Sequence, residues 1–237
     1  MNTPPLISYK HHRYPAAIIS QCVWLYFRFA LSLSFVVVTM AERGVVVICE
    51  SVRAWCEKFG RQHARKVRRQ RRPMGDALHL DEVYLKINSI CQYLWRAVDQ
   101  EGQVLDILVQ PKRKKAAAER FFKNVLTGTC QVPRKVIPDR LASYTQPRAE
   151  ILPDAAHIRD QGANNRAEIS HQSTCLRECR MKRFKSEGQA QWFLSIFSEV
   201  GNLFALSRHS VSAASYRELL NRSLGIWASV TQTAAIQ

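Results

Sequence analysis

The stretch "ALHLDEVYLKI", residues 77–87, decides the fold class. It alternates between apolar and polar residues and is rich in residues that favour β-strands, as a half-buried strand is. Two further segments, "CQYLWRAVD" (91–99) and "QVLDILVQ" (103–110), follow at hairpin spacing, with Gln100-Glu101-Gly102 as a turn between them. The three segments together predict an antiparallel arrangement of strands.

The elements that follow these strands change the topology. We expect a helix over 114–126, short strands over 134–139 and 154–160, and helices over 163–181 and 187–207. A strand reached through a helical crossover pairs in parallel. The predicted fold class is therefore α/β, with a mixed sheet flanked by helices, antiparallel at the front and parallel after the crossover.

The residues before the sheet predict a small all-α region. Helices are expected over 15–29, 31–43 and 49–59, the last stopped by Gly60. Two helices joined by a turn at Gly44, with polar side chains such as Arg53 and Lys58 pointing outward from the second, fit a helix-turn-helix. A generic three-helix packing unit is the alternative. Pro73 and Gly75 then mark a linker, so we expect domains over 1–60 and 77–237, joined by a basic linker over 61–76.

The charge of the chain limits its partners. With 237 residues and a net charge of +16, it should attract nucleic acid or an anionic membrane surface. The segment 61–73 holds seven Lys or Arg and no acid. A solvent-exposed run of charges is the usual interpretation, but here we prefer contact with nucleic-acid phosphates, because the segment directly follows the candidate recognition helix. The basic side chains assigned to nucleic acid here are Arg61, Arg65, Lys66, Arg68, Arg69, Arg71 and Arg72.

Two features argue against an exported or membrane-bound protein. The seven cysteines are odd in number and form no CxxC pair, so we expect reduced thiols in a cytosol and neither a disulfide framework nor a zinc site. Residues 15–41 are strongly apolar, but Arg28 splits them into pieces shorter than the roughly 18–20 residues that a membrane span needs. A membrane-associated basic protein remains a third reading, and buried helices are preferred.

Three carboxylates are candidates for a metal site. Asp81 lies in the first strand on the side of Val83 and Leu85, Asp139 ends the fourth strand, and Glu168 begins a helix. If the first and fourth strands are neighbours, the three converge, and their repulsion would be relieved by divalent cations. Hard oxygen ligands suit Mg²⁺ or Mn²⁺, and two such ions support phosphoryl transfer. Other acids compete for the role, and many acids at strand ends only cap turns: Glu82, Asp99 and Asp106.

Several segments, in order, resemble bacterial insertion-sequence transposases of the DDE class, and most closely the insertion-sequence-six family. They are "LHLDEVYLKI", "YLWRAVDQEGQVLDILVQ", "AAERFFKNVL", "SYTQPRAEILP", "NNRAEISHQ" and "CRMKRFKSEGQAQWFLS". The resemblance runs from about Tyr9 to Val230. It implies an RNase H-like catalytic domain behind an N-terminal helix-turn-helix.

The resemblance also implies an activity and its residues. Asp81, Asp139 and Glu168 match the metal-binding and catalytic triad, which would hold two Mg²⁺ ions, with Mn²⁺ possible. The substrates would be double-stranded DNA: the terminal inverted repeats of an insertion sequence, which are cleaved, and the target DNA that receives the strand. A homodimer or higher assembly on DNA, no membrane, and a cytoplasmic, nucleoid-associated location are implied. Further DNA-binding residues would be Asn164, Asn165, Arg177, Arg180, Lys182, Arg183 and Lys185.

Some positions depart from the family pattern. Pro138 stands where Thr is usual, and Cys175 stands one helical repeat after Glu168, where Arg or Lys is usual. Ile48 occupies the position of a capping Ser, a loss of about 0.5–2 kcal/mol of helix stability. These changes support an alternative function: a catalytically inactive, drifted descendant that only binds DNA.

Overall fold

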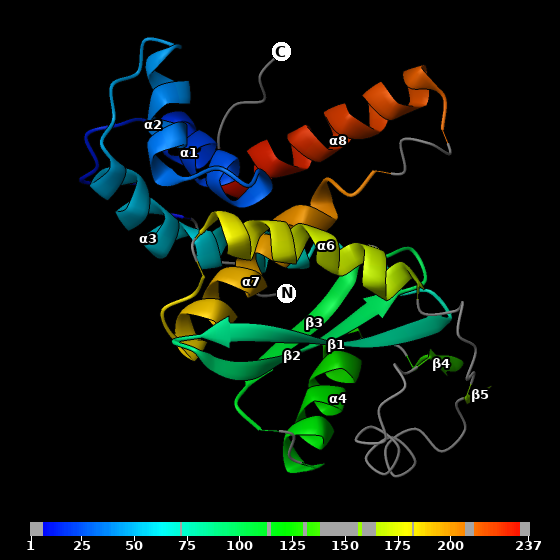
Figure 1. Ribbon diagram of the computed structural model, residues 1–237. Helices are drawn as coiled ribbons and strands as arrows, with labels where there is room; N and C mark the ends of the chain where they lie inside the picture. Colours follow the sequence, from blue (N-terminus) through cyan, green and yellow to red (C-terminus); the bar gives the residue numbers. More distant parts are fainter. Residues whose placement is uncertain are drawn as a thin grey trace. The chain divides into compact units, whose positions relative to one another are not determined.

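The computed structural model describes residues 7–71, 73–112, 115–129, 132–137, 156–157, 165–181, 183–206 and 211–232 (Figure 1). These residues form two compact units. The first consists of residues 1–71 and 196–237, and the second of residues 72–195. The predicted domain boundaries stay predictions, but the first unit is discontinuous in sequence, because the end of the chain packs with its beginning.

The second unit contains a mixed sheet of five strands in the order β3-β2-β1-β4-β5. The strands are β1 (Ala77–Ile87), β2 (Ile90–Asp99), β3 (Val104–Gln110), β4 (Lys135–Ile137) and β5 (Ala156–His157). The pairs β1–β2 and β2–β3 are antiparallel, whereas β1–β4 and β4–β5 are parallel. The prediction of a mixed α/β fold with an antiparallel front is confirmed, and β1 and β4 are neighbours.

Helices cover both faces of this sheet (Figure 1). On one face, α4 (Lys115–Thr129) packs its Phe121 and Phe122 against Leu78, Leu80 and Trp95. On the other face lie α6 (Asn165–Arg180) and the beginning of α7 (Glu187–Leu203), and α6 contacts β1. The alternation of β1 sends its even-numbered side chains to the α4 face and its odd-numbered ones, Asp81 among them, to the α6 face.

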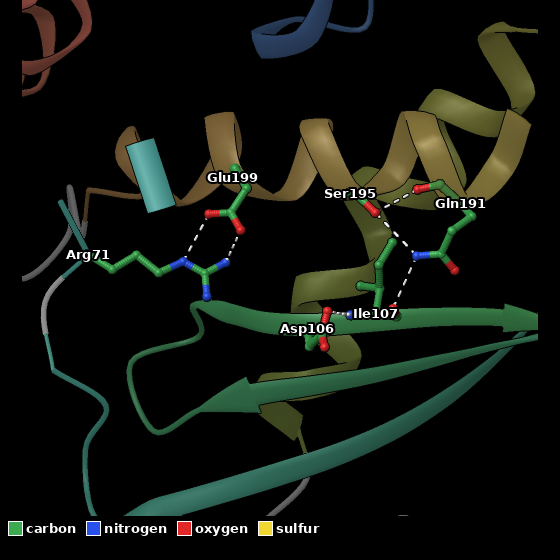
Figure 2. A network of polar contacts seen from close by, with 6 residues as sticks. All are labelled: Arg71, Asp106, Ile107, Gln191, Ser195 and Glu199. Atoms are coloured by element: carbon green, nitrogen blue, oxygen red, sulfur yellow. Dashed lines mark hydrogen bonds and ion pairs between the residues drawn. The ribbon is translucent and has the colours of Figure 1, made fainter. Parts of the chain in front are cut away.

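The outer edge of β3 is closed by one side chain of α7. Gln191 accepts a hydrogen bond from the backbone N–H of Val109 at 2.8 Å and donates one to the carbonyl of Ile107 at 3.2 Å. The carboxylate of Asp106 accepts the N–H of Ile107 at 3.0 Å. These contacts satisfy backbone groups that an edge strand would otherwise offer to another chain, and Figure 2 shows those of Gln191 and Asp106 with Ile107.

The first unit is helical. It contains α1 (Ala16–Arg28), α2 (Leu33–Ala41), α3 (Cys49–Arg68), the end of α7, and α8 (Ala213–Thr231). The expectation that Gly60 ends the third helix is wrong, since α3 runs two further turns beyond it. A Cβ at Gly60 would lie 3.0 Å from Ile196 Cδ1 and 3.1 Å from Phe27, so the glycine serves close packing inside a helix.

A buried aromatic cluster joins the two ends of the chain within this unit. The Tyr9 hydroxyl donates a hydrogen bond to the carbonyl of Thr231 at 3.0 Å and lies 2.9 Å from His63 Nε2. The hydroxyl therefore bridges the backbone of α8 and the imidazole of α3. The rings of Phe59 and Trp227 flank His63.

A helix-turn-helix geometry for α2 and α3 stays a prediction, although α1, α2 and α3 do pack together.

Among the described residues, no helix is both long and apolar enough to cross a membrane. The apolar helices predicted from residues 15–41 instead bury side chains in the first unit. Ile19, Cys22, Val23 and Phe27 of α1 are buried there, as are Val36 and Met40 of α2.

Candidate functional site

Asp81 lies on the central strand and is almost completely buried. It is 3% exposed and faces Arg96 of β2, its register partner, which is 2% exposed. The Arg96 Nη1 atom lies 3.7 Å from Asp81 Oδ2. Burial lowers the pKa of Arg96 to about 10, while the charge of Asp81 and the thiol of Cys175 act in the opposite direction. Arg96 therefore remains a cation at neutral pH and compensates the buried carboxylate.

Helix α6 brings a further group to this pair. Burial raises the pKa of the Cys175 thiol, as do Glu178 and Cys179, and the guanidinium of Arg96 lowers it. Cys175 thus lies within electrostatic range of Arg96 and Asp81. The predicted third acid, Glu168, belongs to the same helix, seven residues or about two turns before Cys175, but its side chain lies outside the described residues.

The second predicted acid, Asp139, also lies outside the described residues. The strand before it is described, and β4 pairs with β1 in parallel, with His79 opposite Ile137. Asp81 follows His79 by two residues in the sequence, and Asp139 follows Ile137 by two. Within the described part of the chain, no group of three or more His, Cys, Asp or Glu could hold a metal ion.

The competing carboxylates each have another role in the described structure. Glu82 points to the α4 face, where it accepts a hydrogen bond from the indole N–H of Trp95 at 3.1 Å. Asp99 accepts the backbone N–H groups of Glu101 and Gln103 and so fixes the β2–β3 turn. Asp106 lies on the outer edge of β3. None of the three shares the α6 face of β1 with Asp81.

The basic side chains predicted to contact DNA fall into several groups. On α3, Arg53, Lys58, Arg61, Arg65 and the following Arg69 are exposed, and Lys66 and Arg68 are half-buried. Of the five exposed positions, Lys58, Arg61, Arg65 and Arg69 recur at three- or four-residue spacing and form one basic stripe along the helix, whereas Arg53 lies five residues before Lys58. Two of the five have polar partners: Arg53 contacts Glu50 at 3.3 Å, and Lys58 contacts His12 at 2.9 Å.

Two of the side chains predicted to contact DNA have partners within the protein, Arg71 half-buried and Arg177 buried. Arg71 forms a paired ion bridge with Glu199, with an Nε–Oε2 distance of 2.9 Å (Figure 2). Arg177 is 1% exposed, and its guanidinium lies 5.0 Å from the centre of the Phe193 ring. Both guanidinium groups support the packing around them.

The remaining predicted residues lie near the end of α6 or beyond description. Arg180, Arg183 and Lys185 are exposed. The carbonyl of Lys185 accepts a hydrogen bond from Asn88 at 2.9 Å, which ties this segment to the β1–β2 hairpin. Asn165 begins α6, but its side chain is outside the described residues, as are Arg72, Asn164 and Lys182 entirely.

Sequence reasoning missed Arg96. The segment "CQYLWRAVD" predicts a strand, but nothing in its composition indicates that Arg96 pairs with Asp81. Counting back through the hairpin from the pairing of Ile87 with Ile90 places Arg96 opposite Asp81, so the register was the signal that could have found it.

Comparison with known proteins adds to this geometry. A family profile described as a DDE domain matches residues 75–207. The chain belongs to the DDE transposases of bacterial insertion sequences. The matched residues contain the whole sheet, together with α4, α6 and α7.

Curated relatives of the family match across most of the chain. The transposase for the insertion sequence-like element IS431mec of Staphylococcus aureus is 27% identical over 178 residues, covering 73% of this chain and 79% of that protein. The transposase for insertion sequence element IS257 in transposon Tn4003, also from Staphylococcus aureus, has the same identity and coverage. An uncharacterised protein of Yersinia pseudotuberculosis is 37% identical over 67 residues, covering 27% of this chain and 63% of that protein.

Proposed function

We propose that this DDE transposase binds the terminal inverted repeats of an insertion sequence and catalyses metal-dependent DNA cleavage and strand transfer. The observation that carries the proposal is the position of Asp81. It is a buried carboxylate on the central strand of the family's DDE domain, on the face that α6 covers. Burial of a carboxylate costs free energy, and a functional role accounts for retaining it.

Asp139 and Glu168 complete the proposed catalytic set. Support for Asp139 comes from the β1–β4 register, which aligns His79 with Ile137 two residues before each aspartate. Support for Glu168 comes from its place on α6, the helix that contacts β1. Three carboxylates supply the hard oxygen ligands that Mg²⁺ prefers, so the donor chemistry fits two Mg²⁺ ions, or Mn²⁺ in their place. When bound, such ions activate the attacking oxygen and stabilise the leaving one.

The protein's own residues would hold the substrate and the first acid. Arg96 fixes the charge balance around Asp81, as its 3.7 Å contact indicates. The basic stripe of α3 is proposed to contact the phosphates of the inverted repeat, with α3 as the second helix of a helix-turn-helix. Arg180, Arg183 and Lys185 are proposed to contact DNA near the catalytic face. Pairing of two DNA ends would require a dimer or a higher assembly.

Strand transfer tests the proposal directly. A labelled element-end duplex is incubated with plasmid DNA, Mg²⁺ and either the native protein, Asp81→Asn or Asp139→Asn. Joined product is expected from the native protein and a loss of at least about a thousandfold from either variant. Asp106→Asn is the matched control, because it makes the same change at the outer edge of β3 and should retain the native rate within about twofold.

The outcomes separate the proposed enzyme from its alternative. Joined product that is equal in native protein and Asp81→Asn would refute the assignment of Asp81. Specific binding of the element end without product from the native protein, even with Mn²⁺, would favour the inactive DNA-binding descendant. A Cys175→Arg variant that gains product would then locate the defect on α6.

A further inference from the structure

On the α4 face of the sheet, just beyond the helix, two tyrosines lie in a row that the described residues leave partly exposed. Tyr84 of β1 pairs with Tyr93 of β2, and Tyr93 pairs with Gln110 of β3, so the three side chains form one row across three strands. The two phenol rings lie 5.4 Å apart, centre to centre. Tyr84 is 56% exposed, whereas Tyr93 packs partly against the core beneath α4.

The neighbouring row on the same face shows where the covered area ends. Glu82 and Trp95 form the preceding cross-strand pair, and both are buried, with Trp95 against Phe121 of α4. One row further on, Tyr84 is open to solvent. Lys86, two residues along β1 on this face, is exposed, and so is Lys112, two residues after Gln110. The row therefore combines aromatic surface with positive charge.

A buried amide beside the rings adds an independent observation. Gln110 is 8% exposed, and its side-chain nitrogen has no hydrogen-bond partner among the described residues. Buried donors in folded proteins are usually paired, and an unpaired one is often completed by a ligand or a water. This donor belongs to the residue directly opposite Tyr93.

We propose that Tyr84, Tyr93 and Gln110 form a binding site for unpaired nucleotides of DNA. Aromatic side chains on the open face of an antiparallel sheet stack on nucleobases in several single-strand-binding domains, and every base offers a stacking face. The charge of the protein, +16, together with Lys86 and Lys112, suits a phosphate backbone better than a neutral or acidic partner. The site lies on the opposite face of β1 from Asp81, so it is separate from the proposed catalytic site.

Stacking and phosphate contact can be separated with matched oligonucleotides. Fluorescence anisotropy is measured for the full-length protein with a labelled oligothymidine and with an abasic strand of the same length. Phosphate contacts would form with both oligonucleotides, whereas stacking on the tyrosine rings would form only with the oligothymidine, which has bases. Native protein is expected to prefer oligothymidine by about tenfold or more, within the range for one or two stacked bases.

Variants of the hairpin then assign the preference. Tyr84→Thr keeps a strand-forming residue and should reduce the preference to about twofold or less, whereas Tyr84→Phe, which keeps the ring, should retain it. Ile90→Ala is the matched control, since Ile90 is 61% exposed on the same hairpin but on the opposite face. Equal binding of both strands by native protein, or equal losses in Tyr84→Thr and Ile90→Ala, would overturn the proposal.

A crosslinking measurement covers the case in which Tyr84→Thr does not fold. Oligothymidine containing 5-iodouracil is irradiated with native protein, and the linked residue is identified by mass spectrometry. Linkage at Tyr84 or Tyr93 supports the site, and linkage only elsewhere refutes it. Oligothymidine binding is measured without Mg²⁺ or an element end and does not require strand transfer, so failure of strand transfer and failure of this site are distinguishable.

Discussion

Acid should destabilise the first unit through His63. This residue is fully buried between Phe59 and Trp227, and burial, followed by the charge of Lys66, lowers its pKa to about 3 from the ordinary 6.5. A histidine with a lowered pKa in the folded state favours folding above its unfolded pKa. That contribution is lost as the pH falls from about 6.5 towards 3, because His63 becomes protonated in the unfolded chain while it stays neutral in the folded chain.

The size of the effect follows from the two pKa values. At pH 7 both states are mostly neutral and the linkage is small. At pH 5 the unfolded histidine is protonated and the folded one is not, so the free energy of unfolding falls by about 2 kcal/mol, at about 1.36 kcal/mol per pH unit below 6.5. With a urea dependence of about 2 kcal/mol/M, the unfolding midpoint should fall by about 1 M between pH 7 and pH 5.

Urea unfolding at the two pH values, followed by tryptophan fluorescence and circular dichroism, measures this shift. His63→Gln is the control, because glutamine is polar and of similar size but does not titrate in this range. The variant should begin less stable at pH 7 and lose about 2 kcal/mol less than native protein on acidification. If native protein and His63→Gln lose the same stability, the acid sensitivity belongs to other groups and the reasoning about His63 is wrong.

Three further outcomes are expected. Arg71→Met should reduce the free energy of unfolding by about 3–5 kcal/mol, because its buried carboxylate partner is left uncompensated, and adding Glu199→Met should recover much of the loss in the same denaturation assay. Gln191→Ala should reduce the free energy of unfolding by about 1–3 kcal/mol, and it should increase aggregation in light scattering because it exposes the edge of β3. The control Gln189→Ala should aggregate less than Gln191→Ala. Arg61→Gln with Arg65→Gln should reduce the salt dependence of element-end binding by about 1.8 in log–log slope; an unchanged slope would remove both residues from the DNA contact.

The sheet was largely predictable because its signals are local. Alternation in residues 77–110 located β1, β2 and β3 to within about one residue, and it placed Asp81 on the same side as Val83 and Leu85. The parallel neighbour β4 followed from the crossover helix. Such features depend on residues close in sequence, so they can be predicted from a single amino-acid sequence.

The errors concern contacts between distant residues. Gly60 was read as a helix end, but the space it leaves is filled by Phe27 and Ile196. The prediction that Arg71 contacts DNA is untested, but the sequence did not reveal its ion pair with Glu199, which lies 128 residues away. The helix α8, capped by the Ser212 side chain, was not predicted at all. Charge patterns cannot distinguish a buried cation from an exposed one when the compensating acid is remote.

The contact between Tyr9 and Thr231 has a consequence for synthesis on the ribosome. The two residues are 222 positions apart, so the helices α1, α2 and α3 emerge long before α8. Trp227, the α8 residue that flanks His63, follows it by 164 residues, so at about 5–20 residues per second the three helices wait roughly 8–33 s with the His63 cluster open on one side. During that interval the nascent first unit is a substrate for chaperones, and a message cut short before the codons of α8 yields N-terminal helices without the partner that closes their core.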